Sequence, residues 1–205
     1  MRQRRSVLVP LVSVVVACWF ALWACAPMST LPVPGSIGEN TNEFALAGNG
    51  TFSTDQAPGL AARGYGVSGQ LSYQHRFNHL NLGGAIFGGT SNLVGGGVFF
   101  GGLFPVGGAN LGFQISAGWL WAEVGVPVTL PLGDSVWLYT EPSVGYRTRF
   151  LRLPMGAGFR LGDHVTLAPE VAVEYLMPWG TAARPVGDLP VGLGVTGALS
   201  VGFGF

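Results

Sequence analysis

The sequence predicts an all-β protein, an antiparallel up-and-down transmembrane β-barrel. From residue 43 onward, apolar residues alternate with small or polar ones in successive segments, which is typical of strands with two different faces. Charged residues make up only 10% of the chain, against a usual share of about 25%. After about residue 26, however, no stretch approaches the roughly 18 unbroken apolar residues of a spanning helix. Strands are therefore the predicted membrane-spanning elements.

Residues 1–25 are predicted to be an export signal peptide. Arg2, Arg4 and Arg5 precede an apolar run that reaches Ala24, which is the order of a secretory signal. Two cleavage sites compete at its end. Leu22–Cys25 resembles a bacterial lipobox, in which Cys25 becomes the lipidated first residue, whereas Ala24–Ala26 suits ordinary signal peptidase. Either cut leaves at most one thiol, so we expect no intramolecular disulfide.

Residues 26–42 are rich in Pro, Ser, Gly and Asn and have no apolar period, so we expect a flexible periplasmic linker. Residues 43–205 form the predicted barrel. Its candidate strands are 43–53, 60–76, 79–89, 94–104, 109–119, 122–132, 135–147, 150–161, 164–177 and 190–205. Ten strands is the first choice, and eight is the alternative because residues 94–104 and 109–132 can be divided differently.

An internal repeat supports this division. Leu132–Tyr146 and Leu161–Tyr175 share the pattern L-G-D-x-V-x-L-x-x-E-x-x-V-x-Y. Each copy opens with a Gly-Asp turn and continues into a strand, so the repeating unit is a β-hairpin. An even number of strands places both ends of the barrel and its short turns on one side, which is the periplasmic side in bacterial barrels.

The composition of the second strand face favours a membrane barrel over a soluble one. In hydrocarbon, an open sheet edge would leave N–H and C=O groups unpaired, and closing the barrel removes the edges. A soluble lipocalin-like lipoprotein would instead turn its apolar face inward and carry many charges outside. The second face here is mainly Gly, Ala, Ser, Thr and Gln, which suits a narrow lumen.

Aromatic residues near the strand ends predict two girdles at the membrane interfaces. The periplasmic girdle comprises Phe77, Phe104, Phe159, Phe203 and Phe205, and the outer girdle comprises Phe52, Tyr65, Trp119, Tyr146, Phe150, Tyr175 and Trp179.

The last strand, which alternates and ends in Phe205, resembles the C-terminal signature of outer-membrane β-barrel proteins of Gram-negative bacteria. This resemblance implies a location in the bacterial outer membrane, with membrane lipid as a partner. It also implies that Phe203 and Phe205 are an assembly signal for the barrel-assembly machinery. A lipid anchor at Cys25 would depart from the usual member of this class.

The alternation of residues along the strands places most of the charged side chains on the lumen face. They are Glu141, Arg147, Arg152, Arg160, Glu170 and Glu174. If the turn at 162–163 sets the register, Arg152 lies opposite Glu174. Because an unpaired ion in a narrow lumen is costly, we expect pairing. Three interpretations stay open: salt bridges that fill the interior, a charged constriction that sorts small solutes, and paired carboxylates for acid–base catalysis.

The expected function is a small outer-membrane barrel with a structural or interaction role and no catalysis. The alternatives are a narrow channel for small solutes, a lipid-modifying outer-membrane enzyme and the soluble lipoprotein. No catalytic, cofactor-binding or metal site is predicted, because His75, His79 and His164 are scattered near turns. Without the three N-terminal Arg, seven Arg face ten Asp and Glu, a net charge near −3, which does not suggest nucleic-acid binding. The many lumen glycines predict either a water column or a lumen plugged by residues 27–42.

Overall fold

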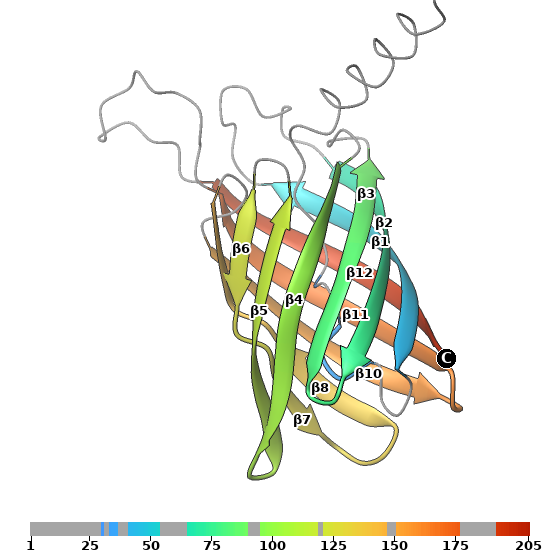
Figure 1. The fold of residues 1–205 in the computed structure, drawn as a ribbon. Helices are drawn as coiled ribbons and strands as arrows, with labels where there is room; N and C mark the ends of the chain where they lie inside the picture. Colours follow the sequence, from blue (N-terminus) through green and yellow to red (C-terminus); the bar gives the residue numbers. More distant parts are fainter. Residues whose placement is uncertain are drawn as a thin grey trace, which may run out of the picture.

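A closed antiparallel β-barrel forms the body of the protein in the computed structural model (Figure 1). The structure describes residues 30, 33–36, 41–53, 65–89, 95–118, 121–146, 151–176 and 192–205. In these residues the chain crosses the barrel ten times, and two of the crossings are each interrupted, which gives twelve strands. The prediction of an all-β barrel with ten crossings is confirmed.

The strands follow the predicted segments closely. They are β1 (Asn42–Ser53), β2 (Tyr65–Phe77), β3 (Leu80–Gly89), β4 (Gly95–Val106), β5 (Ala109–Gly118), β6 (Ala122–Gly125), β7 (Val128–Pro131), β8 (Val136–Thr140), β9 (Ser143–Tyr146), β10 (Leu151–Leu161), β11 (Val165–Leu176) and β12 (Gly192–Gly204).

Two prolines explain the interrupted crossings. Pro127 separates β6 from β7, and Pro142 separates β8 from β9. A proline has no N–H and cannot donate to the ladder, so it ends regular pairing. The two interruptions lie side by side, because the Val126 amide donates to the Pro142 carbonyl at 3.0 Å.

The last strand closes the ring. β12 pairs with β11 on one side and with β1 on the other, from Glu43 opposite Gly204 to Ser53 opposite Gly194. Beyond the ladder, Asn42 and Phe205 exchange backbone hydrogen bonds of 3.1 and 2.9 Å. Closure leaves no open edge for hydrocarbon to surround.

Four short turns lie at the end of the barrel that carries the C-terminus, as Figure 1 shows at the bottom of the view. They join β2 to β3, β4 to β5, β7 to β8 and β10 to β11. Gly107 and Gly162 have φ of 64° and 72°, a left-handed conformation that glycine adopts without strain. We call this end the turn end; in bacterial transmembrane barrels the short turns lie on the periplasmic side. Both copies of the repeat form a turn followed by an outgoing strand, as predicted.

Large apolar side chains cover the outside of the barrel. Leu46, Val67, Ile86, Val98 and Leu199 are each at least half exposed there. The lumen side carries the alternate residues, many of them Ser, Thr, Gln and Glu. This arrangement is the reverse of the one that the soluble lipocalin-like alternative requires. In the described part of the chain, no helix is both long and apolar enough to cross a membrane.

Four of the five residues predicted for the periplasmic girdle are exposed at the turn end, and the fifth, Phe159, is only partly exposed. Phe77, Phe104, Phe203 and Phe205 are exposed on the outer surface, and Phe205 stacks on Phe44 with 5.8 Å between ring centroids. Of the predicted outer girdle, only the side chain of Tyr175 belongs to the described residues. The side chains of Phe52, Tyr65, Trp119, Tyr146, Phe150 and Trp179 lie outside them.

Candidate functional site: the lumen and its strap

The lumen is not the bare space that its glycines suggest. Five large aromatic side chains point into it and are buried: Phe87, Phe99, Trp121, Trp137 and Tyr139. Phe87, Phe99 and Trp121 form one cluster with Ala85, and Trp137 and Tyr139 form another with Ala168. The lumen glycines therefore do not simply leave a water column, because rings occupy much of the space.

Several of these glycines make room for a ring on the neighbouring strand. Gly158 lies opposite Trp137 and Gly156 opposite Tyr139 in the β10–β8 register. A Cβ added at Gly158 would lie 2.0 Å from the Trp137 ring, and one at Gly156 would lie 2.3 Å from the Tyr139 ring. Each pair lets an aromatic ring lie flat against the wall, which is a recognised use of glycine within a strand.

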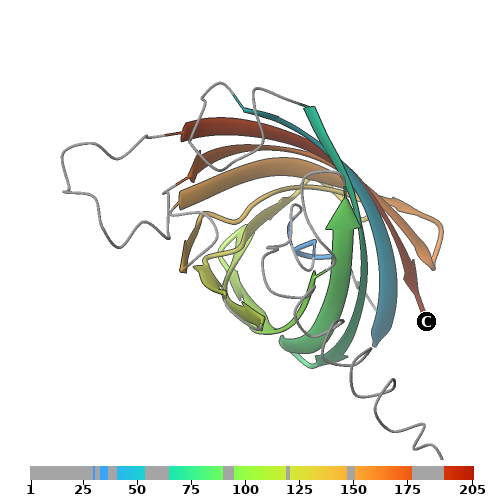
Figure 2. The same cartoon turned by 90° about the horizontal axis from the view of Figure 1, so that it is seen from above.

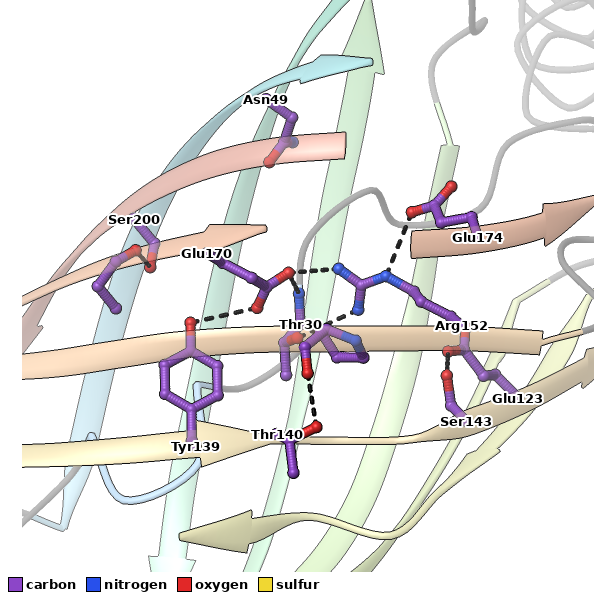
Figure 3. Close-up of polar contacts among 12 residues, drawn as sticks. Thr30, Asn49, Glu123, Tyr139, Thr140, Ser143, Arg152, Glu170, Glu174 and Ser200 are labelled. Atoms are coloured by element: carbon purple, nitrogen blue, oxygen red, sulfur yellow. Dashed lines mark hydrogen bonds and ion pairs between the residues drawn. The ribbon is translucent and has the colours of Figure 1, made fainter. Parts of the chain in front are cut away.

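A buried ionic network crosses the wall between β10 and β11. Arg152 pairs with Glu174 opposite, as the predicted register requires, and its Nε donates to Glu174 Oε1 at 3.3 Å. Its Nη2 also forms an ion pair with Glu170 Oε1. These three residues are 3–5% exposed. Figure 3 shows the guanidinium lying between the two carboxylates.

The network continues to the next strand. The Tyr139 hydroxyl donates to Glu170 Oε2 at 3.2 Å, so both carboxylate oxygens of Glu170 are engaged. Ser143 donates a hydrogen bond to Glu123 on β6. Tyr139 is not evident from the sequence, because apolar residues occupy both faces of β8. Alternation with the exposed Val124 is the signal that could have indicated the lumen side for Glu123.

The remaining predicted lumen charges do not join this network directly. Glu141 is buried, and its Oε2 has no hydrogen-bond partner among the described residues. Arg160 lies near the turn end, where its Nη1 donates to the Asp134 carbonyl at 3.4 Å and its guanidinium lies 5.9 Å from the Trp137 ring centroid. Arg147 lies outside the described residues.

A short N-terminal segment lies inside the barrel. We call Thr30 and Val33–Ser36 the strap, and Figure 2 shows it as the blue trace within the ring of strands. The Thr30 amide donates to Glu170 Oε1 at 3.2 Å, and Arg152 Nη1 donates to Thr30 Oγ1 at 3.1 Å. The buried ionic network therefore holds the strap as well as the wall.

The strap is bound again nearer the turn end. The Trp137 indole N–H donates to the Pro34 carbonyl at 2.7 Å, and Val33 packs against the Trp137 cluster. Ser36 Oγ donates to Glu43 Oε2 at 2.7 Å, and Thr166 Oγ1 donates to the Ser36 carbonyl at 3.3 Å. These strap residues belong to the stretch 26–42, whose composition predicts a flexible periplasmic linker, whereas its described part is bound inside the barrel.

A cavity of about 290 Å³ lies between the strap and the wall formed by β2 to β5. Its polar lining consists mainly of side-chain amides, those of Gln74, Asn81, Asn110 and Gln114. Asn81 donates to Gln74 at 3.2 Å, and Asn110 donates to Thr129 at 2.9 Å. Arg76 and His79 also line the cavity, so the lining offers a cation as well as neutral hydrogen-bonding groups to a small polar molecule.

The three histidines lie at the turn end. His75 hydrogen-bonds to Asn42 Oδ1 at 2.8 Å, and His164 to the Gly204 carbonyl at 3.0 Å. His79 lies against the Phe104 ring, with centroids 5.7 Å apart. Within the described ranges, no group of three or more His, Cys, Asp or Glu is placed to hold a metal ion.

No family model and no curated protein matches the sequence. Among solved structures, the translocator domain of the autotransporter NalP from Neisseria meningitidis has a TM-score of 0.52 at 10% identity, over 96% of this chain and 98% of that one. The KdgM porin gives 0.44 at 13% identity, over 78% and 99%. Neisserial surface protein A gives 0.42 at 12% identity, over 80% and 97%.

The similarity to the NalP domain shows a shared fold. The chain's own surface points to a lipid environment, because large apolar side chains cover the outside of its closed ring of strands. The protein is a closed antiparallel β-barrel whose apolar face is turned outward, which is the arrangement of transmembrane β-barrels.

Proposed function

We propose that this barrel has a structural or interaction role without catalysis, and that its strap closes the lumen to solutes. The observation that carries the proposal is the binding of the strap at two depths, by Glu170 and Arg152 at Thr30 and by Glu43 and Thr166 at Ser36. A segment bound at one point could swing aside, whereas one bound at two points obstructs the path between them.

The electrostatics of the wall favour a strap that stays in place. Arg152 and Glu170 are buried, and both bond to Thr30. Withdrawing the strap would remove hydrogen bonds from two buried charged groups, and bonds to charged groups contribute about 1.5–3 kcal/mol each. The wall and the strap therefore stabilise each other.

Planar-bilayer conductance tests the closure. We expect the wild-type protein to be silent at all voltages, and a variant with residues 30–36 replaced by an equally long Gly/Ser sequence to conduct in discrete steps. Gly108→Ala, at a turn position where an added Cβ meets nothing within 4 Å, is the matched control and should stay silent. Equal conductance of the wild type and the Gly/Ser variant would reject the closure.

A narrow channel for small solutes is the second candidate, and the amide-lined cavity beside the strap favours it. In this case the wild type would show a small conductance that a bulky side chain in the cavity reduces. Asn81→Trp tests this directly, because Asn81 contributes to the polar lining. A silent wild type would remove this candidate.

The lipid-modifying enzyme has less support, because all three histidines lie at the turn end, away from the outer mouth. Lipid A and phospholipid profiles after overexpression test it. A new lipid product that depends on the protein would overturn the non-catalytic proposal.

We also propose that Phe203 and Phe205 act as the assembly signal. In support, Phe205 makes the last backbone contacts of the closing seam while its ring stays 58% exposed. Phe205→Ala should lower the fraction of folded barrel in cells, seen as loss of the compact band in unheated gel samples. Phe104→Ala, another exposed girdle ring, is the control. Equal losses in both variants would indicate a girdle role alone.

The lipobox-like stretch Leu22–Cys25 supports a further proposal, that Cys25 is lipidated. Metabolic labelling with an alkyne fatty acid should mark the wild-type protein and leave Cys25→Ser unmarked. An unmarked wild type would favour ordinary cleavage after Ala26.

A further inference from the structure

We propose that the strap leads the mature N-terminus out through the outer mouth of the barrel, so that the chain threads its own lumen and displays its start on the cell surface. This inference rests on the strap lying in the lumen, as the proposed closure does. It adds a direction and an exit to that closure.

The direction follows from the two depths at which the strap is bound. Ser36 contacts Thr166, the second residue of β11, and Glu43, the second residue of β1, both at the turn end. Thr30 contacts Glu170, near the middle of β11. Followed toward the N-terminus, the chain therefore moves away from the periplasmic end.

The remaining distance to the outer mouth is short. Six residues of β11 follow Glu170 before the strand ends at Leu176. At about 3.3 Å per residue and a strand tilt of about 40°, they rise roughly 15 Å along the barrel axis. Residues 25–29, fully extended, reach about 17 Å. A mature chain that begins at Cys25 is thus long enough to reach the mouth.

A return to the periplasm would be more demanding. The chain would have to reverse inside the lumen and pass the level of Ser36 a second time. Each residue of that second pass would add a backbone N–H and C=O that need partners. At this level the strap already engages the wall through Glu43, Gln74 and Thr166. The outward route needs no reversal.

This threading changes the location of a lipid anchor. An acyl group on Cys25 would emerge at the outer mouth and not at the periplasmic leaflet. The barrel would then present a surface-facing N-terminus to extracellular partners.

Cysteine labelling of intact cells with a membrane-impermeant maleimide tests the proposal. Met28→Cys lies two residues before the strap. Ser91→Cys, in the connection between β3 and β4, marks the outer side, and Gly108→Cys, in the turn between β4 and β5, marks the periplasmic side. The parent chain supplies the background. We expect Met28→Cys to label equally before and after permeabilisation, like Ser91→Cys, and Gly108→Cys to label only afterwards.

Labelling of Met28→Cys only after permeabilisation would overturn the threading. The conductance experiment separates this result from a failure of the closure. A silent wild type with a periplasmic Met28→Cys retains the closure and rejects the threading. A conducting wild type with Met28→Cys labelled from outside rejects the closure and retains the threading.

Discussion

The two sides of the lumen are filled in different ways. On the side formed by β8 to β11, buried charges bind the strap through Arg152 and Glu170. On the side formed by β3 to β6, the rings of Phe87, Phe99 and Trp121 fill the part of the lumen away from the turn end, and the cavity beside the strap remains nearer the turn end. The difference shows which parts of the interior depend on the N-terminal segment and which are complete without it.

The aromatic side is built from rings seated over glycines. Phe87 and Trp121 lie 6.2 Å apart between ring centroids. A Cβ added at Gly97 or Gly118 would come within 2.5 or 2.0 Å of Trp121. Burial of apolar rings is non-directional, so this side needs no partner of fixed geometry. Buried charges do need such partners, and the strap supplies some of them.

The largest effect should come from Arg152→Ala. This change leaves Glu170 and Glu174 buried without their guanidinium partner, and breaking a buried pair costs about 3–5 kcal/mol. Urea unfolding in lipid vesicles measures the stability, and bilayer conductance should show an opened lumen. Arg160→Ala removes a cation outside the network and should cost less than about 1 kcal/mol. Similar losses in both variants would contradict the special role of Arg152.

Trp121→Ala tests the aromatic side and should cost about 3 kcal/mol, near the lower end for large aromatic truncations. Because Trp121 packs with Phe87 and Phe99 and not with the described strap residues, we expect the lumen to stay closed in the bilayer assay. Conductance in this variant would show that the two sides are not independent.

Gly158→Ala should destabilise by about 1–3 kcal/mol, because the new Cβ displaces the Trp137 ring. Gly197→Ala is the matched control in β12, where an added Cβ meets nothing within 4 Å, and it should change stability by no more than about 0.5 kcal/mol. The same unfolding measurement compares the pair. If Gly197→Ala lost as much stability as Gly158→Ala, the loss would come from reduced backbone flexibility and not from displacement of the Trp137 ring.

The smallest effect should come from Trp137→Phe, which keeps a ring but removes the indole donor to the Pro34 carbonyl. A neutral hydrogen bond contributes about 1 kcal/mol net. Urea unfolding should show this modest loss of stability. When Val33→Cys is combined with Trp137→Phe, the cysteine should react faster with a small maleimide than it does beside the wild-type Trp137. Unchanged reactivity would mean that this bond does not hold the strap.

Alternation and turns made much of the fold predictable. The Gly-Asp turn at 162–163 fixed the register that places Arg152 opposite Glu174. Alternation could not tell which of Phe99 and Phe100 faces the lumen. Neighbouring residues of a strand face opposite sides, and because these two are identical, either choice fits the pattern equally well. In the structure only Phe99 enters the lumen. The lumen position of Trp137 could not be predicted for a similar reason, because apolar residues occupy both faces of β8.

The place of the strap could not be predicted from its own residues. The strap has no period, and its position depends on contacts with side chains far along the chain. Thr30 bonds to Glu170, and Pro34 to Trp137. Such contacts exist only once the barrel has closed.

Photo-crosslinking from Val33 tests the central claim most directly, because Val33 packs against the Trp137 cluster inside the lumen. An aliphatic diazirine amino acid at position 33 should crosslink within the same chain to the peptide that carries Trp137 and Tyr139, as mapped by mass spectrometry in native membranes. Crosslinks to periplasmic proteins, with none to the barrel wall, would show that the strap lies outside the barrel and would contradict the account.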